Sequence, residues 1–391
     1  MNDAENGEIG CRIQSAGRPT WAEVNLNALA ENYRALTSLL STSTTGYPRI
    51  LPVIKADAYG HGMIPVARTL AAAGVSLFAV GLVEEGVALR QAGISQDILV
   101  LGTAWRGFEE TALQNNLILA VDNPECVRRL EITATNMADS VSVHIKVDTG
   151  MARLGVRWDA MEPLLTSVRK ANRVCLKGVF SHLSSADERD PAYTNEQASK
   201  FEHSLTSVRE AGLDPGEIHF ANSAGLLYHD HFRKWSVRSG LAIYGYSPDP
   251  QRSPVKLFPV LSLKTTVGPI RSLAAGEPIG YGRMFTAARP TRMAILPVGY
   301  ADGFSRRFSG RGRVIVRDRW AEIIGNVSMD MIAVDLTDLP DVREGDEVIL
   351  LGSSPHCRMA AGEWADILES IPYEVLCGIA ARVPRVYLNG N

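Results

Sequence analysis

The chain has 391 residues, a length that exceeds one ordinary domain and indicates two. Apolar residues make up 46% of the chain and charged residues 21%, which is typical of a globular protein with a large core. The formal net charge of -3 provides no basic footprint for nucleic acid, so nucleic acid is excluded as an expected partner.

Short apolar runs alternate with segments of helical periodicity over residues 50–245. We predict strands at the apolar runs 50–56, 77–81, 98–101, 118–121, 141–147, 175–181, 218–220 and 235–238. Helices are predicted between them at 63–73, 84–92, 124–131, 160–171 and 195–211. Asn123-Pro124 indicates an N-cap with proline in the first helical turn, and Gly74 and Gly212 lie where helices should stop.

Eight strand–helix units in succession predict an α/β fold with a (β/α)₈ TIM-type barrel over residues 27–248. A doubly wound parallel sheet shares much of this pattern and stays an alternative. Strand-like runs dominate after Pro248, with one helix at 359–370, and they predict a mostly β domain over 249–391. We expect the strand-like stretch 21–26 to join that domain. The runs are 260–267, 292–297, 313–316, 321–324, 332–336 and 347–351.

Neither a membrane span nor a metal centre is predicted. The longest apolar stretch, 70–83, is shorter than the roughly 20 residues that a span needs, and the polar N-terminus lacks a signal-peptide core. We therefore expect a cytoplasmic protein. His229 and His231 have no third ligand nearby in sequence, which favours a solvated loop. The five cysteines are scattered without a CxxC pair, which disfavours a disulfide framework or zinc site: Cys11, Cys126, Cys175, Cys357 and Cys377.

The most informative segment is 53–62, with the sequence VIKADAYGHG. Lys55 lies at the end of an apolar strand, at the mouth of the predicted barrel. Burial there would lower the pKa of its amine and make it a nucleophile for Schiff-base formation and a candidate base. Taken alone, a lysine that extends its ammonium from a strand end into solvent is an equally good interpretation. The two glycines of Gly60-His61-Gly62 match half of a dinucleotide-binding fingerprint, and the rest of that fingerprint is missing.

Polar segments also follow the later strands of the predicted barrel. They lie at 148–155, 180–182, 221–223 and 238–241, each at the carboxyl end of a strand. Active sites of (β/α)₈ barrels form at this face, and the loops after strands seven and eight commonly hold phosphate. Ser223, with backbone amides at a helix start, can bind phosphate there. A lysine opposite a phosphate site fits a phosphorylated aldehyde cofactor, pyridoxal phosphate.

Segment 53–62 resembles the lysine signature of the alanine racemase family and matches its KADAYGHG core without departure. The resemblance extends in order from Trp21 to Tyr387, and the chain is identified as a member on these motifs. They are KVDTGMARLG at 146–155, ANS at 221–223, RSGLAIYG at 238–245, GYG at 280–282, GYADG at 299–303, SMDM at 328–331 and IPYE at 371–374. One departure is Phe285, where the family often has tyrosine.

The resemblance implies the interconversion of L-alanine and D-alanine, which supplies D-alanine for bacterial peptidoglycan. Lys55 would hold pyridoxal phosphate as an internal aldimine and act as one of two bases. Tyr281 would be the other base, supplied by the second subunit of a head-to-tail homodimer. Racemisation removes the α-proton from one face and returns it to the other, so one base on each side suits the reaction.

The resemblance also assigns the remaining site residues. Arg238 would face the pyridine nitrogen, and His182 would link Arg238 toward Tyr281. Arg153 would contact the cofactor's phenolic oxygen and the substrate carboxylate, which the backbone amide of Met329 would also meet. The other expected cofactor-binding residues, most of them at the phosphate, are Tyr59, Asn222, Ser223, Gly240, Leu241 and Tyr373.

Three features of these assignments have physical consequences. An ordinary tyrosine has a pKa of about 10, so Tyr281 needs surroundings that stabilise phenolate. Arg238 can only donate hydrogen bonds, which keeps the ring nitrogen unprotonated and disfavours transamination. In several family members the lysine that matches Lys146 is carbamylated, which would position Arg153.

Rival functions differ in what they require of the sequence. A racemase for serine, basic or several amino acids is the nearest alternative, because the sequence does not fix the side-chain pocket. Its membrane-bound and periplasmic forms are disfavoured by the absence of a span and a signal peptide. A decarboxylase on the same barrel would not be expected to carry the Tyr281 and Arg238 motifs together. A non-catalytic cofactor carrier resembles the barrel alone and would not need the β domain.

Overall fold

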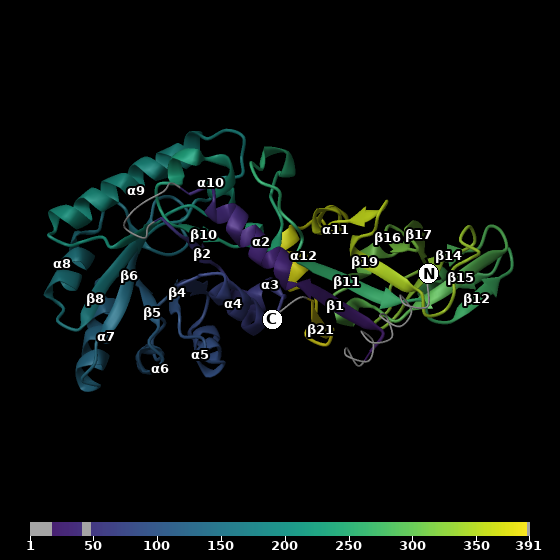
Figure 1. Cartoon of the computed structure of the whole chain (residues 1–391), viewed down its shortest axis with the longest axis horizontal. Coiled ribbons are helices and arrows are strands. Elements are labelled where there is room, and N and C mark those ends of the chain that lie inside the picture. The colour runs from purple at the N-terminus through teal and green to yellow at the C-terminus, as the bar shows by residue number, and fades with distance from the viewer. Residues whose placement is uncertain (1–17, 41–47, 389–391) are drawn as a thin grey trace. The chain divides into compact units, whose positions relative to one another are not determined.

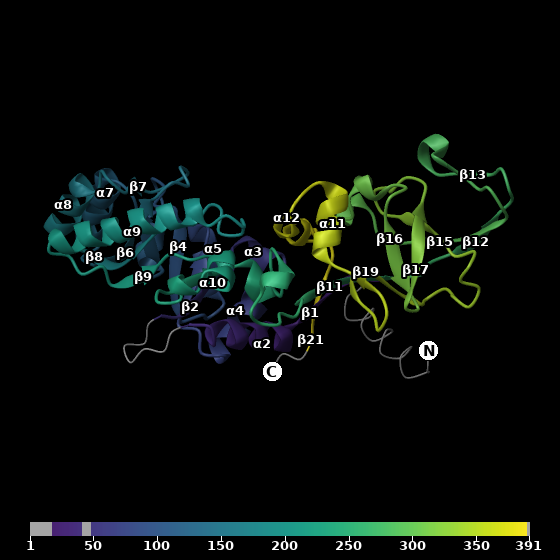
Figure 2. The same ribbon diagram turned by 90° about the horizontal axis from the view of Figure 1, so that it is seen from above.

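The computed structural model describes residues 18–40 and 48–388, which divide into two compact units. The barrel unit consists of Ala28–Ala58 and Met63–Phe258. The β unit consists of residues 18–27, Tyr59–Gly62 and 259–388. The elements of both units are shown in Figures 1 and 2. The domain boundary placed at residue 248 from the sequence stays a prediction.

Eight parallel strands of the barrel unit form a closed ring. They are β2 (Ile50–Pro52), β3 (Leu77–Val80), β4 (Asp97–Thr103), β5 (Ile118–Val121), β6 (Val141–Asp148), β8 (Val174–Phe180), β9 (Glu217–His219) and β10 (Val237–Ser239). Strands β3 to β9 form one sheet, to which the short β7 (Val156–Arg157) adds at β6, and β10 pairs with β2. Bridges Val53–Ala79 and His219–Ser236 join the two sheets at both edges. The ring confirms the predicted (β/α)₈ barrel, since a doubly wound sheet has two open edges.

Helices surround the barrel strands, and Figure 1 shows α5 to α9 on their outer side. Gly74 and Gly212 have positive φ after helices α4 and α9, which confirms the predicted helix stops. The helices are α2 (Leu26–Thr37), α4 (Met63–Ala72), α5 (Val83–Gln91), α6 (Glu109–Gln114), α7 (Pro124–Asn136), α8 (Glu162–Lys170), α9 (Ala192–Glu210) and α10 (Ser223–Tyr228). Of these, α2, α6 and α10 were not predicted from the sequence.

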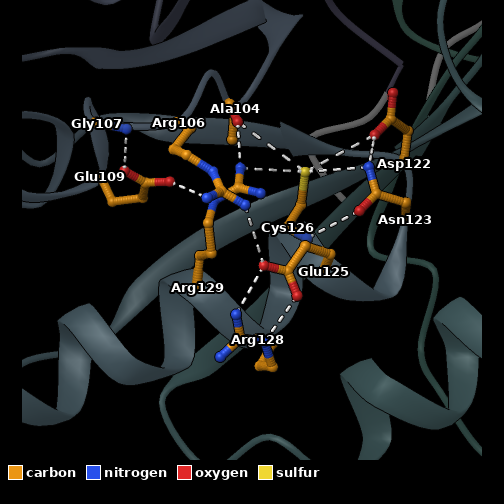
Figure 3. A network of polar contacts seen from close by, with 10 residues as sticks. All are labelled: Ala104, Arg106, Gly107, Glu109, Asp122, Asn123, Glu125, Cys126, Arg128 and Arg129. Atoms are coloured by element: carbon orange, nitrogen blue, oxygen red, sulfur yellow. Dashed lines mark hydrogen bonds and ion pairs between the residues drawn. The ribbon is translucent and has the colours of Figure 1, made fainter.

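Helix α7 begins as the sequence predicts. The Asn123 side chain accepts a hydrogen bond from the Cys126 amide at 2.9 Å, and Pro124 occupies the first turn. Figure 3 shows that the same helix end is tied to α6 by Arg129, which pairs with Glu109 at 2.6 Å. Both side chains of this ion pair are largely buried. The contact fixes the loop between β4 and α6 against the start of α7.

The interior of the barrel carries polar side chains along β6. Successive residues of a strand point to opposite faces, so Val143 and Ile145 share one face while His144 and Lys146 share the other. His144 contacts His219 of β9, which places this second face inside the ring. A polar interior is costly unless its groups are hydrogen bonded. Inside this barrel His144 and Lys146 have such partners, His219 and the Leu101 carbonyl.

The β unit is built on one large mixed sheet with the order β12-β15-β18-β17-β16-β19-β11-β1-β21, to which β20 adds at β19. Strand β1 (Thr20–Asn25) pairs antiparallel with β11 and parallel with β21. The strands are β11 (Leu261–Thr266), β12 (Ile270–Leu273), β15 (Thr291–Leu296), β16 (Arg313–Val316), β17 (Arg319–Ile324), β18 (Ile332–Asp335), β19 (Glu347–Ser353), β20 (Arg358–Met359) and β21 (Arg385–Leu388). Helices α11 (Ala361–Leu368) and α12 (Pro372–Cys377) and the hairpin β13 (Pro278–Ile279) with β14 (Phe285–Thr286) complete it.

Within residues 18–40 and 48–388, no helix combines the length and apolarity that crossing a membrane requires. The same residues contain no group of three or more histidine, cysteine or acidic side chains placed to bind a metal ion. The solvated loop predicted for this histidine pair is wrong for His229, which is 7% exposed and hydrogen bonded to the Ala186 carbonyl at 2.9 Å, whereas His231 is exposed. Four of the five cysteines are free, and Cys11 lies outside the described residues.

Candidate active site

Lys55 stands at the carboxyl end of β2, where the chain enters a left-handed turn. Ala56, Asp57 and Ala58 have φ between 51° and 54°, a conformation that non-glycine residues rarely adopt. The Glu85 carboxylate accepts hydrogen bonds from the amides of Ala56 at 2.6 Å and Gly81 at 2.7 Å. Glu85 therefore holds together the ends of β2 and β3, and it was not singled out from the sequence.

The expected burial of Lys55 is wrong for this chain, because its side chain is exposed. Strand β2 ends at Pro52, so Lys55 belongs to the rim and not to the barrel interior. Its Cβ and Cδ face Gly81, and a Cβ added to that glycine would lie 3.5 Å from each of them. A lysine amine in this position is accessible to a carbonyl compound that enters the barrel mouth.

Lys146 is the lysine that burial affects. It is 8% exposed and donates to the Leu101 carbonyl at 3.2 Å. Loss of solvent, together with repulsion from Arg238 and Arg153, lowers the pKa of Lys146 to about 8. Lys55 adds a smaller repulsion, whereas Asp122 opposes the shift. Arg238, Arg153 and Lys55 thus all lie close enough to repel Lys146, which makes the barrel mouth suited to an anionic ligand.

Arg238 of β10 is 3% exposed and donates to acceptors at the carboxyl ends of β8 and β9. Its Nη1 donates to His219 Nδ1 and to the His219 carbonyl, both at 2.9 Å. Its Nη2 donates to the carbonyls of Ser181 and Phe220 and to His182 Nδ1, the last at 3.0 Å. Burial lowers its pKa to about 9, so it remains a cation at neutral pH. None of its hydrogen bonds to the described residues uses Nε, which leaves this donor for a ligand.

His182 is neutral in this arrangement. Burial and the nearby charges, Arg238 and Arg153 first among them, hold its pKa well below the usual value. Its Nδ1 accepts from Arg238, so the ring proton must reside on Nε2. His182 can therefore donate from Nε2 to an anionic oxygen at the barrel mouth.

Backbone amides converge at Ser223 after β9 and β10. The amides of Gly240 and Ala242 both donate to Ser223 Oγ at 3.2 Å. An oxygen of a phosphate placed here could accept from the same donors, so the donor set suits a phosphate group. Asn222 uses its side chain to cap α10, accepting from Gly225 at 2.9 Å, and Leu241 begins the next turn. Ala242 was not predicted as a site residue.

The remaining expected residues are distributed over both units. Tyr59 and Tyr373 belong to the β unit, with ring centroids 6.0 Å apart, and burial raises the pKa of Tyr59. Arg153 lies exposed on the loop after β6. Tyr281 and Met329, also of the β unit, are 73% and 52% exposed. The Asn326 side chain donates to the Tyr281 carbonyl at 2.6 Å and anchors that loop.

These features define a class of protein, a (β/α)₈ barrel with a rim lysine and a buried arginine–histidine cluster, joined to a β unit. Residues 24–248 match the family model of the alanine racemase N-terminal domain, and 260–387 match that of its C-terminal domain. The chain belongs to the alanine racemase family.

The chain is similar to known alanine racemases over nearly its whole length. The chain is 43% identical to an alanine racemase of Symbiobacterium thermophilum and 40% identical to one of Halothermothrix orenii, each over 95% of this chain and 97% of the relative. Among solved structures, alanine racemase of Clostridium difficile has a TM-score of 0.88 at 34% identity, covering 95% of this chain and 96% of that one. Alanine racemase of Bartonella henselae with covalently bound pyridoxal phosphate has a TM-score of 0.84 at 29% identity, covering 95% and 99%.

Proposed function

We propose that this chain is an alanine racemase that interconverts L-alanine and D-alanine with pyridoxal phosphate. Family membership supports the activity, and one observation of the site carries the assignment of the cofactor. Arg238 is buried and held by five acceptors, yet its Nε–H has no partner among the described residues. A donor that is held in place and not used by the protein suits the ring nitrogen of a heteroaromatic ligand.

The other residues fit the same cofactor. The Lys55 amine is accessible at the rim for covalent attachment, and the donors at Ser223 suit the phosphate. Asn222, Gly240 and Leu241 shape that phosphate site, to which Tyr59 and Tyr373 are proposed to add. When bound, the cofactor supplies an electron-withdrawing ring that acidifies the α-proton of the amino acid.

Proton transfer is assigned to two side chains. Lys55 takes or returns the α-proton on one face of the substrate, and Tyr281 does so on the other. His182, which donates from Nε2, stabilises the Tyr281 phenolate, and Arg238 fixes His182 by donating to its Nδ1. Arg153 and the amide of Met329 are proposed to bind the substrate carboxylate.

A homodimer with shared sites is part of the proposal. Tyr281, Met329 and Met331 are 73%, 52% and 53% exposed in the single chain. Large apolar side chains of this kind are commonly covered in an assembly. We propose that the second subunit covers them and that each site receives Tyr281 and Met329 from it.

Lys146 is proposed to carry a carbamate. Its lowered pKa leaves part of the amine neutral, and the neutral nitrogen can attack CO₂ and release one proton. The product is an anion among the cations Lys55, Arg153 and Arg238. It would reduce their mutual repulsion and position Arg153.

The test of the proposed function combines an assay with a mapping experiment. Purified protein with pyridoxal phosphate should convert each alanine enantiomer into the other, and borohydride should fix the cofactor to the peptide that contains Lys55. Attachment at another residue, or no racemisation, would overturn the proposal.

A panel of L-amino acids in heavy water then measures specificity, because only substrates take up deuterium at the α-carbon. A cytoplasmic location and a role in supplying D-alanine for peptidoglycan stay predictions of the sequence.

A further inference from the structure

A chain of three buried side chains runs from the cofactor side of the barrel into its interior. Arg238 Nη1 contacts His219 Nδ1 at 2.9 Å, and His219 Nε2 contacts His144 Nδ1 at 2.8 Å. These residues lie on β10, β9 and β6, and each is at most 3% exposed. Neither His219 nor His144 was singled out from the sequence.

The donors and acceptors of this chain permit one assignment of protons. Arg238 can only donate, so His219 Nδ1 must carry a lone pair. A neutral His219 then has its proton on Nε2, and that proton is donated to His144 Nδ1. His144 therefore accepts at Nδ1 and carries its own proton on Nε2. The charged form of either histidine would put two N–H groups against each other at one of these contacts.

Both rings are neutral and held in place. Burial lowers the pKa of His144 to about 3, and it also holds the pKa of His219 well below the usual value. The Phe180 ring stacks on His219 with centroids 4.7 Å apart and an interplanar angle of 7°. Gly178 leaves room for His144, because a Cβ at that position would lie 2.5 Å from the His144 ring.

His144 also borders a polar cavity at the amino-terminal ends of the barrel strands. The cavity has a volume of about 720 Å³, and His144 lies in its wall together with Arg49, Asp97, Ser142 and Glu217. Water in a polar space of this size can accept the Nε2–H of His144. The three side chains thus connect Arg238 with this cavity, on the side of the barrel opposite to Lys55.

We propose that His144 is a positioning residue of the racemase, which fixes the tautomer of His219 and thereby the orientation of Arg238. With His144 as acceptor, His219 presents a lone pair to the guanidinium, and Arg238 keeps its Nε–H available for the cofactor ring. Without that acceptor, His219 can move its proton to Nδ1, where it opposes the guanidinium donor. The final step, from Arg238 to the cofactor, rests on the proposed function.

The tautomer is tested on the unmodified protein. Nitrogen-15 NMR of histidine-labelled protein, with and without pyridoxal phosphate, distinguishes protonated from unprotonated ring nitrogens among the eight histidines. We expect His219, assigned by its loss in His219→Asn, to be unprotonated at Nδ1 and protonated at Nε2. A His219 protonated at Nδ1, or a mixture of tautomers, would overturn the proposal whether or not the protein racemises alanine.

A matched pair of variants tests the consequence for the reaction. His144→Asn keeps an acceptor oxygen near the position of Nδ1, whereas His144→Leu has a similar volume and no acceptor. In the holoenzyme we expect His144→Leu to weaken cofactor binding about tenfold, the factor for one lost buried hydrogen bond. We also expect it to raise the pyruvate formed per racemisation event. His144→Asn should stay close to the wild type in both.

Thermal unfolding of both variants separates positioning from packing. A packing role would lower the stability of His144→Leu without changing the ratio of pyruvate formation to racemisation. Equal ratios and equal cofactor affinities in the Asn and Leu variants would refute the positioning role. If His144→Leu does not fold, the NMR measurement on the unmodified protein still decides the tautomer on which the proposal depends.

Discussion

Replacing Glu85 by glutamine tests whether this side chain holds the strained turn that presents Lys55. The left-handed conformation costs roughly 1–2 kcal/mol per non-glycine residue, or about 3–6 kcal/mol for Ala56, Asp57 and Ala58 together. Glu85 opposes this cost through Oε1, which accepts from Ala56, and Oε2, which accepts from Gly81 and Leu82 at 2.7 and 3.1 Å.

Glutamine keeps the shape of Glu85 but has one acceptor oxygen and no charge. One of the two sets of amides therefore meets an NH₂ donor. A hydrogen bond to a charged group contributes about 1.5–3 kcal/mol, so we expect Glu85→Gln to lower the free energy of unfolding by about 2 kcal/mol. The turn then samples other conformations, and the kcat of racemisation should fall about tenfold.

Urea unfolding and the racemisation rate of Glu85→Gln should be compared with those of Glu84→Gln. Glu84 precedes Glu85 on the same helix, is exposed, and makes no hydrogen bond or ion pair with the described residues. The control variant should match the wild type in both measurements. If Glu85→Gln also matched it, the carboxylate would not be what holds the Lys55 turn.

Other residues give further predictions. In CO₂-free buffer Lys146→Met should be more stable than the wild type by up to about 3 kcal/mol below pH 8, because a pKa lowered to about 8 means that folding disfavours the ammonium. That difference in stability should shrink as the pH rises above 8. A difference that does not change with pH would contradict the lowered pKa of Lys146. Arg129→Gln should lower the free energy of unfolding by about 2 kcal/mol because it leaves a buried carboxylate unpaired, whereas Arg128→Gln, on the exposed side of the same helix, should leave the urea midpoint unchanged. Equal midpoints would refute this distinction. Tyr281→Phe should keep the cofactor and slow α-proton exchange from one alanine enantiomer, and mixing it with Lys55→Ala should restore activity through subunit exchange. Equal loss from both enantiomers would contradict the two-base assignment.

The barrel could be predicted because its signal is periodic and local. Short apolar runs such as 118–121 coincide with β5 (Ile118–Val121), and the Asn123-Pro124 pair marks the start of α7. Helix α2 (Leu26–Thr37) was missed although its buried residues Leu26, Leu29 and Leu36 recur at helical spacing. The β-sheet of the second unit was predicted less completely, since its short strands β12 and β21 depend on partners far away in the sequence.

The candidate site was predicted less well where it depends on tertiary structure. Lys55 was expected to be buried because the apolar run continues to Ala56, but the chain leaves the strand after Pro52. Alanine and aspartate have no pattern that announces a left-handed turn. His144 and His219 resemble ordinary strand residues, because nothing in the sequence shows that two strands bring His144 Nδ1 within 2.8 Å of His219 Nε2.

The four cations at the barrel mouth destabilise the protein without a ligand and favour the binding of anionic ligands. Lys55, Arg153 and Arg238 each repel Lys146, and burial lowers the pKa of both Lys146 and Arg238 because the interior solvates their charges poorly. A bound phosphate, a substrate carboxylate and a carbamate would each introduce negative charge. Because Lys146 and Arg238 are fixed by their strands before any ligand arrives, these two cations need little reorganisation when the anions bind. The same fixed field favours the deprotonated form of a tyrosine brought to it, which is the state that a second base requires.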